Sequence, residues 1–168
     1  MSEHAGKRRW PLADAAPVAT ALLQTLEPAC ERIAIAGSIR RKRPDVGDIE
    51  LLCITKMLPL GLDIFGTPTG AAAALDLKIL ALLGEGVLAY RLNSLGRRAF
   101  GPLNKLLIHV ASGIPVDVFT TTKKNWGMSL VVRTGTAEMN VRLMARLLQL
   151  GYKGHAYGGI SIDGVEVP

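Results

Sequence analysis

The amino-acid sequence predicts an α+β fold, in which a mixed or antiparallel sheet with helices on one side precedes a small, mostly helical C-terminal part. Three observations predict it. Short β-rich runs occur before residue 122, two of these runs are separated only by Ser112 and Gly113, and helical patterns follow from Lys123 onward. We therefore expect two parts, residues 1–121 and residues 122–168.

The expected elements follow from the spacing of the apolar residues along the chain. Apolar side chains at helical spacing predict a covering helix over residues 11–29, where Pro17 marks a kink or a restart. An alanine- and leucine-rich segment between two glycines predicts a second helix over residues 71–83. The remaining predictions are strands over 32–36, 48–55, 105–111 and 114–121, helices over 126–133 and 137–150, and a hairpin around Asp163 and Gly164.

Length and composition set the broad class of the protein. A chain of 168 residues that is 49% hydrophobic can bury the core of one compact domain. No apolar run approaches the roughly 20 residues that cross a bilayer, and the first residues are charged rather than typical of a signal peptide. Cys30 and Cys53 lack metal-ligand spacing, which favours reduced core thiols. We expect a soluble, cytoplasmic protein with no membrane partner.

The net charge of +6 is concentrated in local basic clusters, including residues 40–43 and 123–124. Such clusters suit phosphate-rich partners, although a basic protein that binds no nucleic acid is an equal alternative from charge alone. Contacts with DNA are expected from Arg40, Lys42, Arg43 and Lys105. For Lys105, a solvated surface position is the alternative to a DNA path.

Two carboxylates at the start of a predicted strand point to metal chemistry. Because side chains alternate along a strand, Asp48 and Glu50 share one face while Ile49 turns toward the core. Two adjacent anions need cations, and two divalent ions about 4 Å apart can neutralise a triphosphate and activate a hydroxyl group. Oxygen ligands of this kind favour Mg²⁺ or Mn²⁺. The sequence therefore predicts two ions held by shared carboxylates.

A third carboxylate is expected from a neighbouring strand. Asp117 is the acidic residue inside the β-rich run 114–121, and its flanking valines face the opposite way. Taken alone, such an acid would be assigned to a solvent-facing strand position. Upstream of Asp48, a Gly37-Ser38 turn opens a short helix and is followed by Arg41, a pattern suited to holding phosphate. This combination favours a catalytic role for Asp117.

The same residues resemble a known family. The stretch 37–41, followed by Gly47, Asp48 and Glu50, resembles the nucleotidyltransferase signature of family X DNA polymerases, the group that includes DNA polymerase beta. The similarity continues through residues 116–118 and through 133–136 with Asn140, and spans residues 33 to about 157. A minimal form is implied, with only the palm over residues 1–121 and a nucleotide-binding subdomain over residues 122–168.

The resemblance implies a role for each matching residue. Asp48 and Glu50 would bind both metal ions, and Asp117 would bind the catalytic ion and help to activate the primer hydroxyl. Two Mg²⁺ or Mn²⁺ ions, a nucleoside triphosphate and primer-template or gapped DNA are the implied cofactors and partners, with an unidentified protein supplying further DNA contacts. Nucleotide contacts are implied for Gly37, Ser38, Arg41, Gly47, Thr134, Gly135 and Asn140.

Two positions depart from the family pattern. Glu50 stands where the polymerases usually have aspartate, and Arg133 stands where an aromatic residue is common, which bears on discrimination between sugars. The expected activity is DNA-directed addition of a deoxynucleotide to a primer 3′-hydroxyl, in short-gap filling. The alternative is a template-independent nucleotidyltransferase acting on a nucleic-acid end, a protein or a small molecule. A nucleic-acid-binding module without catalysis is a third possibility, which the three intact carboxylates disfavour.

Overall fold

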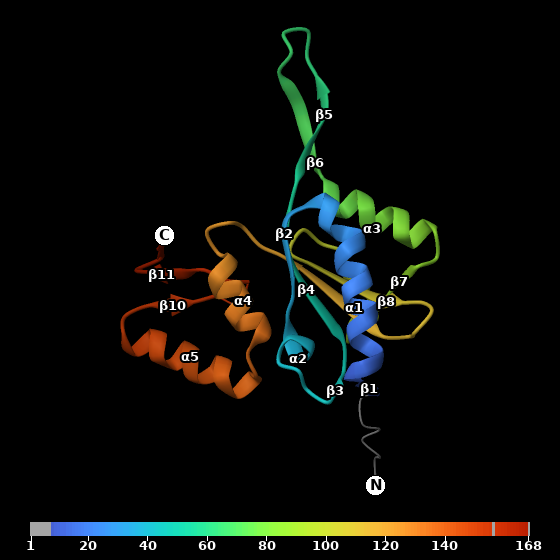
Figure 1. Ribbon diagram of the computed structural model, residues 1–168. Helices are drawn as coiled ribbons and strands as arrows, with labels where there is room; N and C mark the ends of the chain where they lie inside the picture. Colours follow the sequence, from blue (N-terminus) through green and yellow to red (C-terminus); the bar gives the residue numbers. More distant parts are fainter. Residues whose placement is uncertain (1–7, 156, 168) are drawn as a thin grey trace.

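The computed structural model describes residues 8–155 and 157–167, so residues 1–7, 156 and 168 of the two expected parts lie outside the described residues. The described chain has an α+β fold built on a five-stranded mixed sheet (Figure 1). Strands β4 and β9 run parallel, and the other pairings in this sheet are antiparallel. Its strand order is β2 (Cys30–Ile35), β4 (Ile49–Thr55), β9 (Pro115–Thr120), β8 (Asn104–His109) and β7 (Leu88–Tyr90).

Two helices cover one face of the main sheet. Helix α1 (Leu12–Leu26), which is followed by the 3₁₀ helix η1 (Glu27–Ala29), and helix α3 (Ala74–Gly84) bury apolar side chains against it. Pro17 does not divide α1. Alternating residues of β4 and β9 complete this core, namely Ile49, Leu51, Cys53, Val116 and Val118. The helix predicted over residues 11–29 and the central strands are therefore confirmed.

The opposite face of the sheet is also covered. Leu52 and Phe119, which lie on the opposite side of their strands from the first core, pack with Trp126 of helix α4 (Trp126–Thr134) in a second apolar cluster. Helices α1 and α3, which precede residue 122, thus share one side as expected, and α4 of the C-terminal part covers the other. The sheet is buried on both faces because both β4 and β9 carry apolar residues at successive positions, a pattern typical of central strands.

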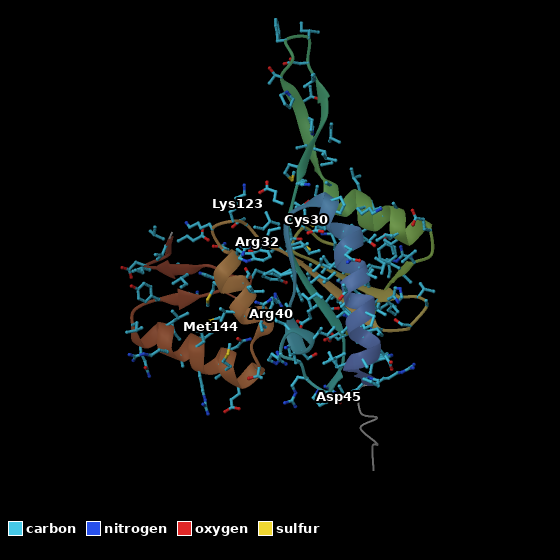
Figure 2. The ribbon with its side chains drawn as sticks, in the orientation of Figure 1. Cys30, Arg32, Arg40, Asp45, Lys123 and Met144 are labelled. Carbon is cyan, nitrogen blue, oxygen red and sulfur yellow. The ribbon has the colours of Figure 1, made fainter. Side chains whose placement is uncertain are left out.

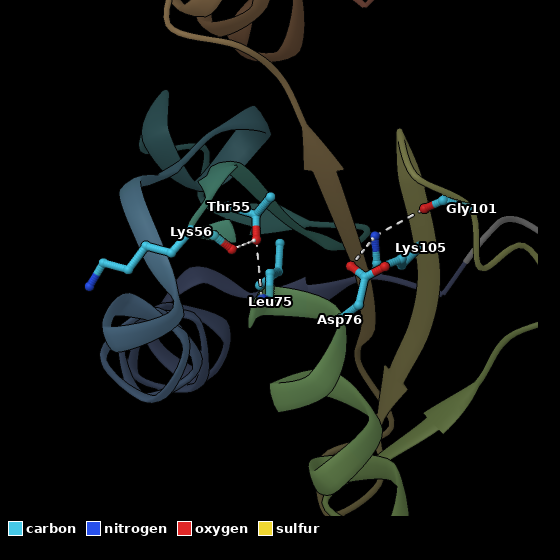
Figure 3. Close-up of polar contacts among 6 residues, drawn as sticks. All are labelled: Thr55, Lys56, Leu75, Asp76, Gly101 and Lys105. Atoms are coloured by element: carbon cyan, nitrogen blue, oxygen red, sulfur yellow. Dashed lines mark hydrogen bonds and ion pairs between the residues drawn. The ribbon is translucent and has the colours of Figure 1, made fainter. Parts of the chain in front are cut away.

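The helix predicted over residues 71–83 begins later than expected. Ala71 to Ala73 belong instead to β6 (Pro68–Ala73), which pairs with β5 (Met57–Leu62) in a hairpin that projects from the body of the molecule (Figure 1). The Thr55 hydroxyl of β4 accepts a hydrogen bond from Leu75 N at 3.2 Å and so caps α3 from outside its own segment (Figure 3). Strand pairing therefore overrides the helix propensity of these alanines.

Lys105 lies inside the molecule rather than along a DNA path. Its side chain on β8 is fully buried, and its ammonium group lies 2.9 Å from Asp76 Oδ1 and donates to Gly101 O at 2.9 Å (Figure 3). The prediction that Lys105 contacts DNA is therefore corrected, because a fully buried side chain cannot reach a ligand on the surface. The pair instead ties the first turn of α3 to the sheet.

The C-terminal part is less helical than expected. Helix α5 (Ala137–Gln149) follows α4, as predicted. It is followed by a small antiparallel sheet of β10 (Lys153–Gly154), β11 (Ile160–Ile162) and β12 (Val165–Glu166). The predicted turn at Asp163 and Gly164 is confirmed, and both residues have positive φ. These elements lie together on the α4 side of the main sheet (Figure 1).

Two short elements close the region between β2 and β4. Helix α2 (Gly37–Arg40) begins at Gly37, as the Gly-Ser turn predicts, and Gly37 has a φ of 61°, which favours glycine. Strand β3 (Asp45–Val46) then pairs with β1 (Trp10–Pro11) at the start of the described chain. This region leads directly into β4. Among residues 8–155 and 157–167, no helix has the length and apolar character to span a membrane.

We expect Asp76→Ala to lower the free energy of unfolding by about 3 kcal/mol, because the Lys105 ammonium would stay buried without its carboxylate partner. Asp14→Ala is the matched control, since Asp14 also lies in the first turn of a helix but is exposed, and its loss should be below about 1 kcal/mol. Urea unfolding curves give both values. Equal losses in the two variants would show that the buried ion pair does not stabilise the fold.

Candidate functional site

Two of the three predicted carboxylates lie side by side on one face of the sheet, and the third directly precedes one of the two strands. Glu50 of β4 is the register partner of Asp117 of β9, and Asp48 lies one residue before β4 begins. Neighbouring strands lie about 4.8 Å apart, so the Glu50 and Asp117 side chains emerge side by side. The buried residues next to them, Ile49 and Val116, point into the opposite core. The carboxylates therefore face the side that α4 covers.

The surroundings of Glu50 shift the ionisation of its carboxyl group. Burial raises the pKa of Glu50 to about 7, and repulsion from Asp48 and Asp117 adds to the shift. Arg133 and Arg41 lower the pKa of Glu50 but do not reverse this effect. A carboxyl group whose pKa is raised by neighbouring carboxylates is stabilised in its ionised form by a cation. The electrostatics of the site therefore favour binding of positive charge.

Arg91 contributes a cation that the sequence pattern does not reveal. It follows β7, and its guanidinium forms a part-buried ion pair with Asp117 Oδ1. Its backbone N–H donates to Leu106 O at 3.0 Å, which holds this segment beside β8. Because β8 lies between β7 and β9, the sheet order places Arg91 within reach of Asp117. The ion pair fixes one oxygen of the Asp117 carboxylate.

Arg133 also lies beside the carboxylates. Its guanidinium carbon is 3.7 Å from the ring centroid of Phe119 and 5.1 Å from that of Tyr157. Burial lowers the pKa of Arg133, while Tyr157, Glu50 and Asp117 partly offset this effect. Phe119 follows Asp117 by two residues and therefore shares its face of β9. The end of α4 is thus held over the acidic site by a stacked arginine.

The predicted phosphate-binding segment lies against Glu50. A side-chain carbon added at Gly37 would collide with Glu50 Oε2, so only glycine fits at the start of α2. Ser38 is half-buried within α2, and Gly47 is buried just before Asp48. The backbone around the turn thus approaches the carboxylates closely. The structure places these three predicted nucleotide-binding residues beside the acidic residues.

Arg41 connects this segment to the turn between α4 and α5. Its guanidinium donates a hydrogen bond to Thr134 O and a longer one, 3.4 Å, to Gly135 O. Asn140 Nδ2 donates to Val132 O at 2.8 Å and so fixes the same turn from α5. Among the described residues, Thr134 Oγ1 and Asn140 Oδ1 are buried without hydrogen-bond partners. Neither oxygen is exposed to solvent in this structure.

A cavity of about 340 Å³ lies between α2 and the α4–α5 turn. Both Arg40 and Arg41 line it, and Figure 2 shows Arg40 at the side of α2 that faces α4. Arg40, Lys42 and Arg43 are exposed around α2, unlike Lys105. The basic cluster therefore lies on the surface next to the cavity. The other lining residues are Leu130, Val131, Thr134, Gly135, Thr136 and Met139.

The donor set of the site suits a hard divalent cation. Three carboxylates offer only oxygen ligands, which a hard divalent cation prefers. Within residues 8–155 and 157–167, no group of three or more histidine, cysteine, aspartate or glutamate side chains is gathered closely enough to hold an ion. The three carboxylates thus fit a metal ion in their ligand chemistry and not in the side-chain arrangement of this structure.

A scan of protein-family models and a search of curated proteins found no match to this chain. Sequence reasoning did not single out Arg91, and it placed Arg133 in the sugar-contacting turn without indicating that its guanidinium stacks on Phe119. Arg91 is 26 positions from Asp117 in the chain and meets it only through sheet pairing. Arg133 meets Phe119 only because α4 packs on the sheet.

The raised pKa of Glu50 makes the stability of the metal-free protein depend on pH. The folded state binds the proton more tightly than the unfolded state, so ionisation of Glu50 destabilises the fold as pH rises through about 7. We expect Glu50→Gln to raise the free energy of unfolding by on the order of 2–3 kcal/mol at about pH 8. At about pH 4, where the carboxyl group is protonated in both states, the substitution should have little effect.

Unfolding curves with a chelator present at both pH values measure this difference. Glu85→Gln is the control, since Glu85 is exposed at the end of α3. Its effect should be small and nearly the same at both pH values. If Glu50→Gln changed the free energy of unfolding by the same amount at both pH values, the Glu50 carboxylate would not be destabilised in the fold.

Proposed function

We propose that this chain is a two-metal-ion nucleotidyltransferase similar to family X DNA polymerases, with Asp48, Glu50 and Asp117 as its metal ligands. The observation that carries the proposal is that Glu50 and Asp117 are register partners on the parallel strands β4 and β9. Asp48 immediately precedes β4. In this proposal the main sheet is the palm, and residues 122–168 form the nucleotide-binding subdomain. The pKa of Glu50, which burial raises and repulsion from Asp48 and Asp117 raises further, supports the proximity of the three carboxylates.

Each residue named in this proposal would have a defined task in the reaction. Two bound Mg²⁺ or Mn²⁺ ions would neutralise the triphosphate and activate the attacking hydroxyl group. Asp48 and Glu50 would hold both ions, and Asp117 would bind the catalytic one and help to activate the hydroxyl for in-line attack on the α-phosphate, with pyrophosphate leaving. Arg91 pairs with one oxygen of Asp117 and so fixes the orientation of that carboxylate.

The nucleotide would lie between α2 and the α4–α5 turn. Ser38 and Arg41 are suited to the phosphates, for which Arg41 would exchange its contact with Thr134 O for a charge-assisted bond. The backbone of Gly135 would lie along the sugar. The cavity of about 340 Å³ that Thr134 and Gly135 help to line supports this placement.

The acceptor in this proposal is the 3′-hydroxyl of a primer in gapped DNA, held by the exposed basic residues Arg40, Lys42 and Arg43. One observation favours the alternative, a template-independent transferase. Lys105 is buried, which leaves fewer cations available for a DNA path than the sequence predicted. The two proposals share their chemistry and differ in whether a template base selects the nucleotide.

Primer extension on a duplex with a one-nucleotide gap tests both proposals. We expect incorporation with Mg²⁺ or Mn²⁺, and a loss of roughly 100- to 1,000-fold in Asp117→Asn, because a ligand to a catalytic ion contributes several kcal/mol. Asp163→Asn is the matched control, since Asp163 lies in the β11–β12 turn, where asparagine also tolerates positive φ. Its rate should equal that of the unchanged protein.

Offering each nucleotide singly separates the alternatives. Incorporation that follows the template base supports the polymerase, and untemplated addition supports the second transferase. If Asp117→Asn were as active as the Asp163→Asn control, the proposed role of Asp117 would be refuted.

Metal binding has a readout that does not depend on activity. Mg²⁺ or Mn²⁺ at about tenfold above its dissociation constant should stabilise the fold by about 1.4 kcal/mol, because it binds only the folded state. The thermal unfolding midpoint should rise in the unchanged protein and in Asp163→Asn. It should not rise in Asp48→Asn, which lacks a proposed ligand. The same rise in all three proteins would place the ion elsewhere.

A further inference from the structure

The β5–β6 hairpin exposes an unusual amount of apolar surface. Between residues 57 and 73 the one charged residue is Asp63, and the hairpin projects away from the main sheet (Figure 1). A two-stranded hairpin standing alone in water is marginally stable, and large exposed apolar patches mark interaction sites. Its exposed large apolar residues are Met57 58%, Leu58 44%, Leu60 69%, Leu62 64%, Ile64 92% and Phe65 85%.

The two strands of the hairpin differ in side-chain size. Strand β5 carries methionine and leucines, whereas β6 carries a run of glycine and alanine from Gly70 onward. Leu58 pairs with Ala72, and Gly61 pairs with Gly70. The hairpin therefore has a bulky strand beside a shallow one. Two such hairpins placed antiparallel about a twofold axis would each set their bulky strand over the shallow strand of the other.

A groove at the base of the hairpin is lined by apolar residues that suit the apolar side chains of its tip. A cavity of about 420 Å³ lies between α3, the end of α1 and the start of β5, and Leu58, Leu77 and Ala81 are among its lining residues. The tip presents Ile64 and Phe65, which are almost fully exposed. An antiparallel pair of hairpins would bring the tip of one copy to the base of the other. Apolar side chains at the tip would then fill an apolar groove.

Charge at the two ends of the hairpin is complementary. Asp63 lies at the tip, where its Oδ1 accepts hydrogen bonds from the N–H groups of Phe65 and Thr67, each at 2.8 Å, and so orders the turn. Lys56 and Lys78 line the groove at the base. The antiparallel arrangement would place the acid of each copy near the lysines of the other. A protein with a net charge of +6 would otherwise repel its own copy.

We propose that two copies of this chain form a twofold dimer through their β5–β6 hairpins, with the tip of each hairpin in the base groove of the other. The six large apolar residues on each hairpin are between 44% and 92% exposed and lie within one short segment, which suits the apolar centre of an interface to which each partner contributes roughly 800 Å². Pro59 lacks an N–H group, so the copies pack through side chains rather than by adding strands. This dimer does not depend on the proposed nucleotidyl transfer.

The distribution of charge disfavours a lipid surface as the occupant. Segments that enter an anionic membrane carry basic residues next to the apolar tip. Here the tip carries an acid, and the cations lie at the far end of the hairpin. The tip therefore fits a basic, apolar groove, which the chain itself provides.

Sedimentation equilibrium at tens of micromolar tests the dimer. The unchanged protein should sediment at twice the chain mass of 17.9 kDa. Phe65→Ser removes a large apolar side chain from the tip. Leu77→Glu places a negative charge in the groove, close to Asp63 of the other copy. Each should weaken the dimer about 100-fold, because both symmetric contacts are lost. Val141→Ser on α5 is the control, since Val141 is 69% exposed but distant in the fold, and its dimer should be unchanged.

Mixing the two variants makes the test specific. The groove of the Phe65→Ser chain and the tip of the Leu77→Glu chain are intact, so a mixed dimer keeps one of its two contacts and should be about tenfold tighter than the dimer of either variant alone. Circular dichroism confirms that each variant folds, as expected for exposed positions. The proposal is overturned if the unchanged chain stays monomeric, and flotation with anionic vesicles would then assign the hairpin to lipid. A dimer that survives both substitutions also overturns it.

Discussion

The parallel pairing of β4 with β9 is the constraint on which the rest of the structure depends. It aligns Ile49 with Val116 on one face, where they are buried against α1 and α3, and Glu50 with Asp117 on the other. Burial of the first face fixes the register, because a shift of one residue would exchange the apolar and acidic positions. The same hydrophobic energy that stabilises the core therefore holds two carboxylates at adjacent strand positions.

Three arginines from separate elements surround these carboxylates. Arg91 pairs with Asp117 from the end of β7, Arg133 stacks on Phe119 from α4, and Arg41 joins the α2 segment to the turn after α4. The electrostatic balance of the site thus depends on packing between the sheet and the C-terminal elements. Burial, with repulsion from Asp48 and Asp117, still raises the pKa of Glu50. Three oxygen-donor carboxylates at adjacent positions are the physical basis for proposing bound cations.

Helix α3 and the hairpin before it form a second functional region, on the other side of the molecule from α4 and α5 (Figure 1). Thr55 caps the helix, and the buried pair of Asp76 with Lys105 attaches it to β8 (Figure 3). The base of the hairpin is therefore rigidly anchored, while its apolar side chains remain exposed. A rigid base lowers the entropy lost when such a surface associates. The proposed dimer and the proposed active site use different faces of the fold.

The amino-acid sequence by itself determined the elements whose patterns are local. Alternating apolar residues specified β4, β8 and β9, and the positions of Asp48, Glu50 and Asp117 within these patterns indicated that the three acids share one face of the sheet. Patterns that depend on distant segments were misread. Ala71 to Ala73 have high helix propensity, but pairing with β5 and the cap from Thr55 decide their conformation.

Tertiary structure alone decided which charges are exposed and which are paired. A lysine in a β-rich run gives no sign of whether its ammonium meets water or a carboxylate, and only the packing of α3 on β8 gives Lys105 the buried partner Asp76. Arg91 likewise meets Asp117 through sheet order rather than sequence spacing. The spacing of apolar residues along the chain shows which face of a helix or strand is buried. Contacts between distant residues depend instead on how whole helices and strands pack together.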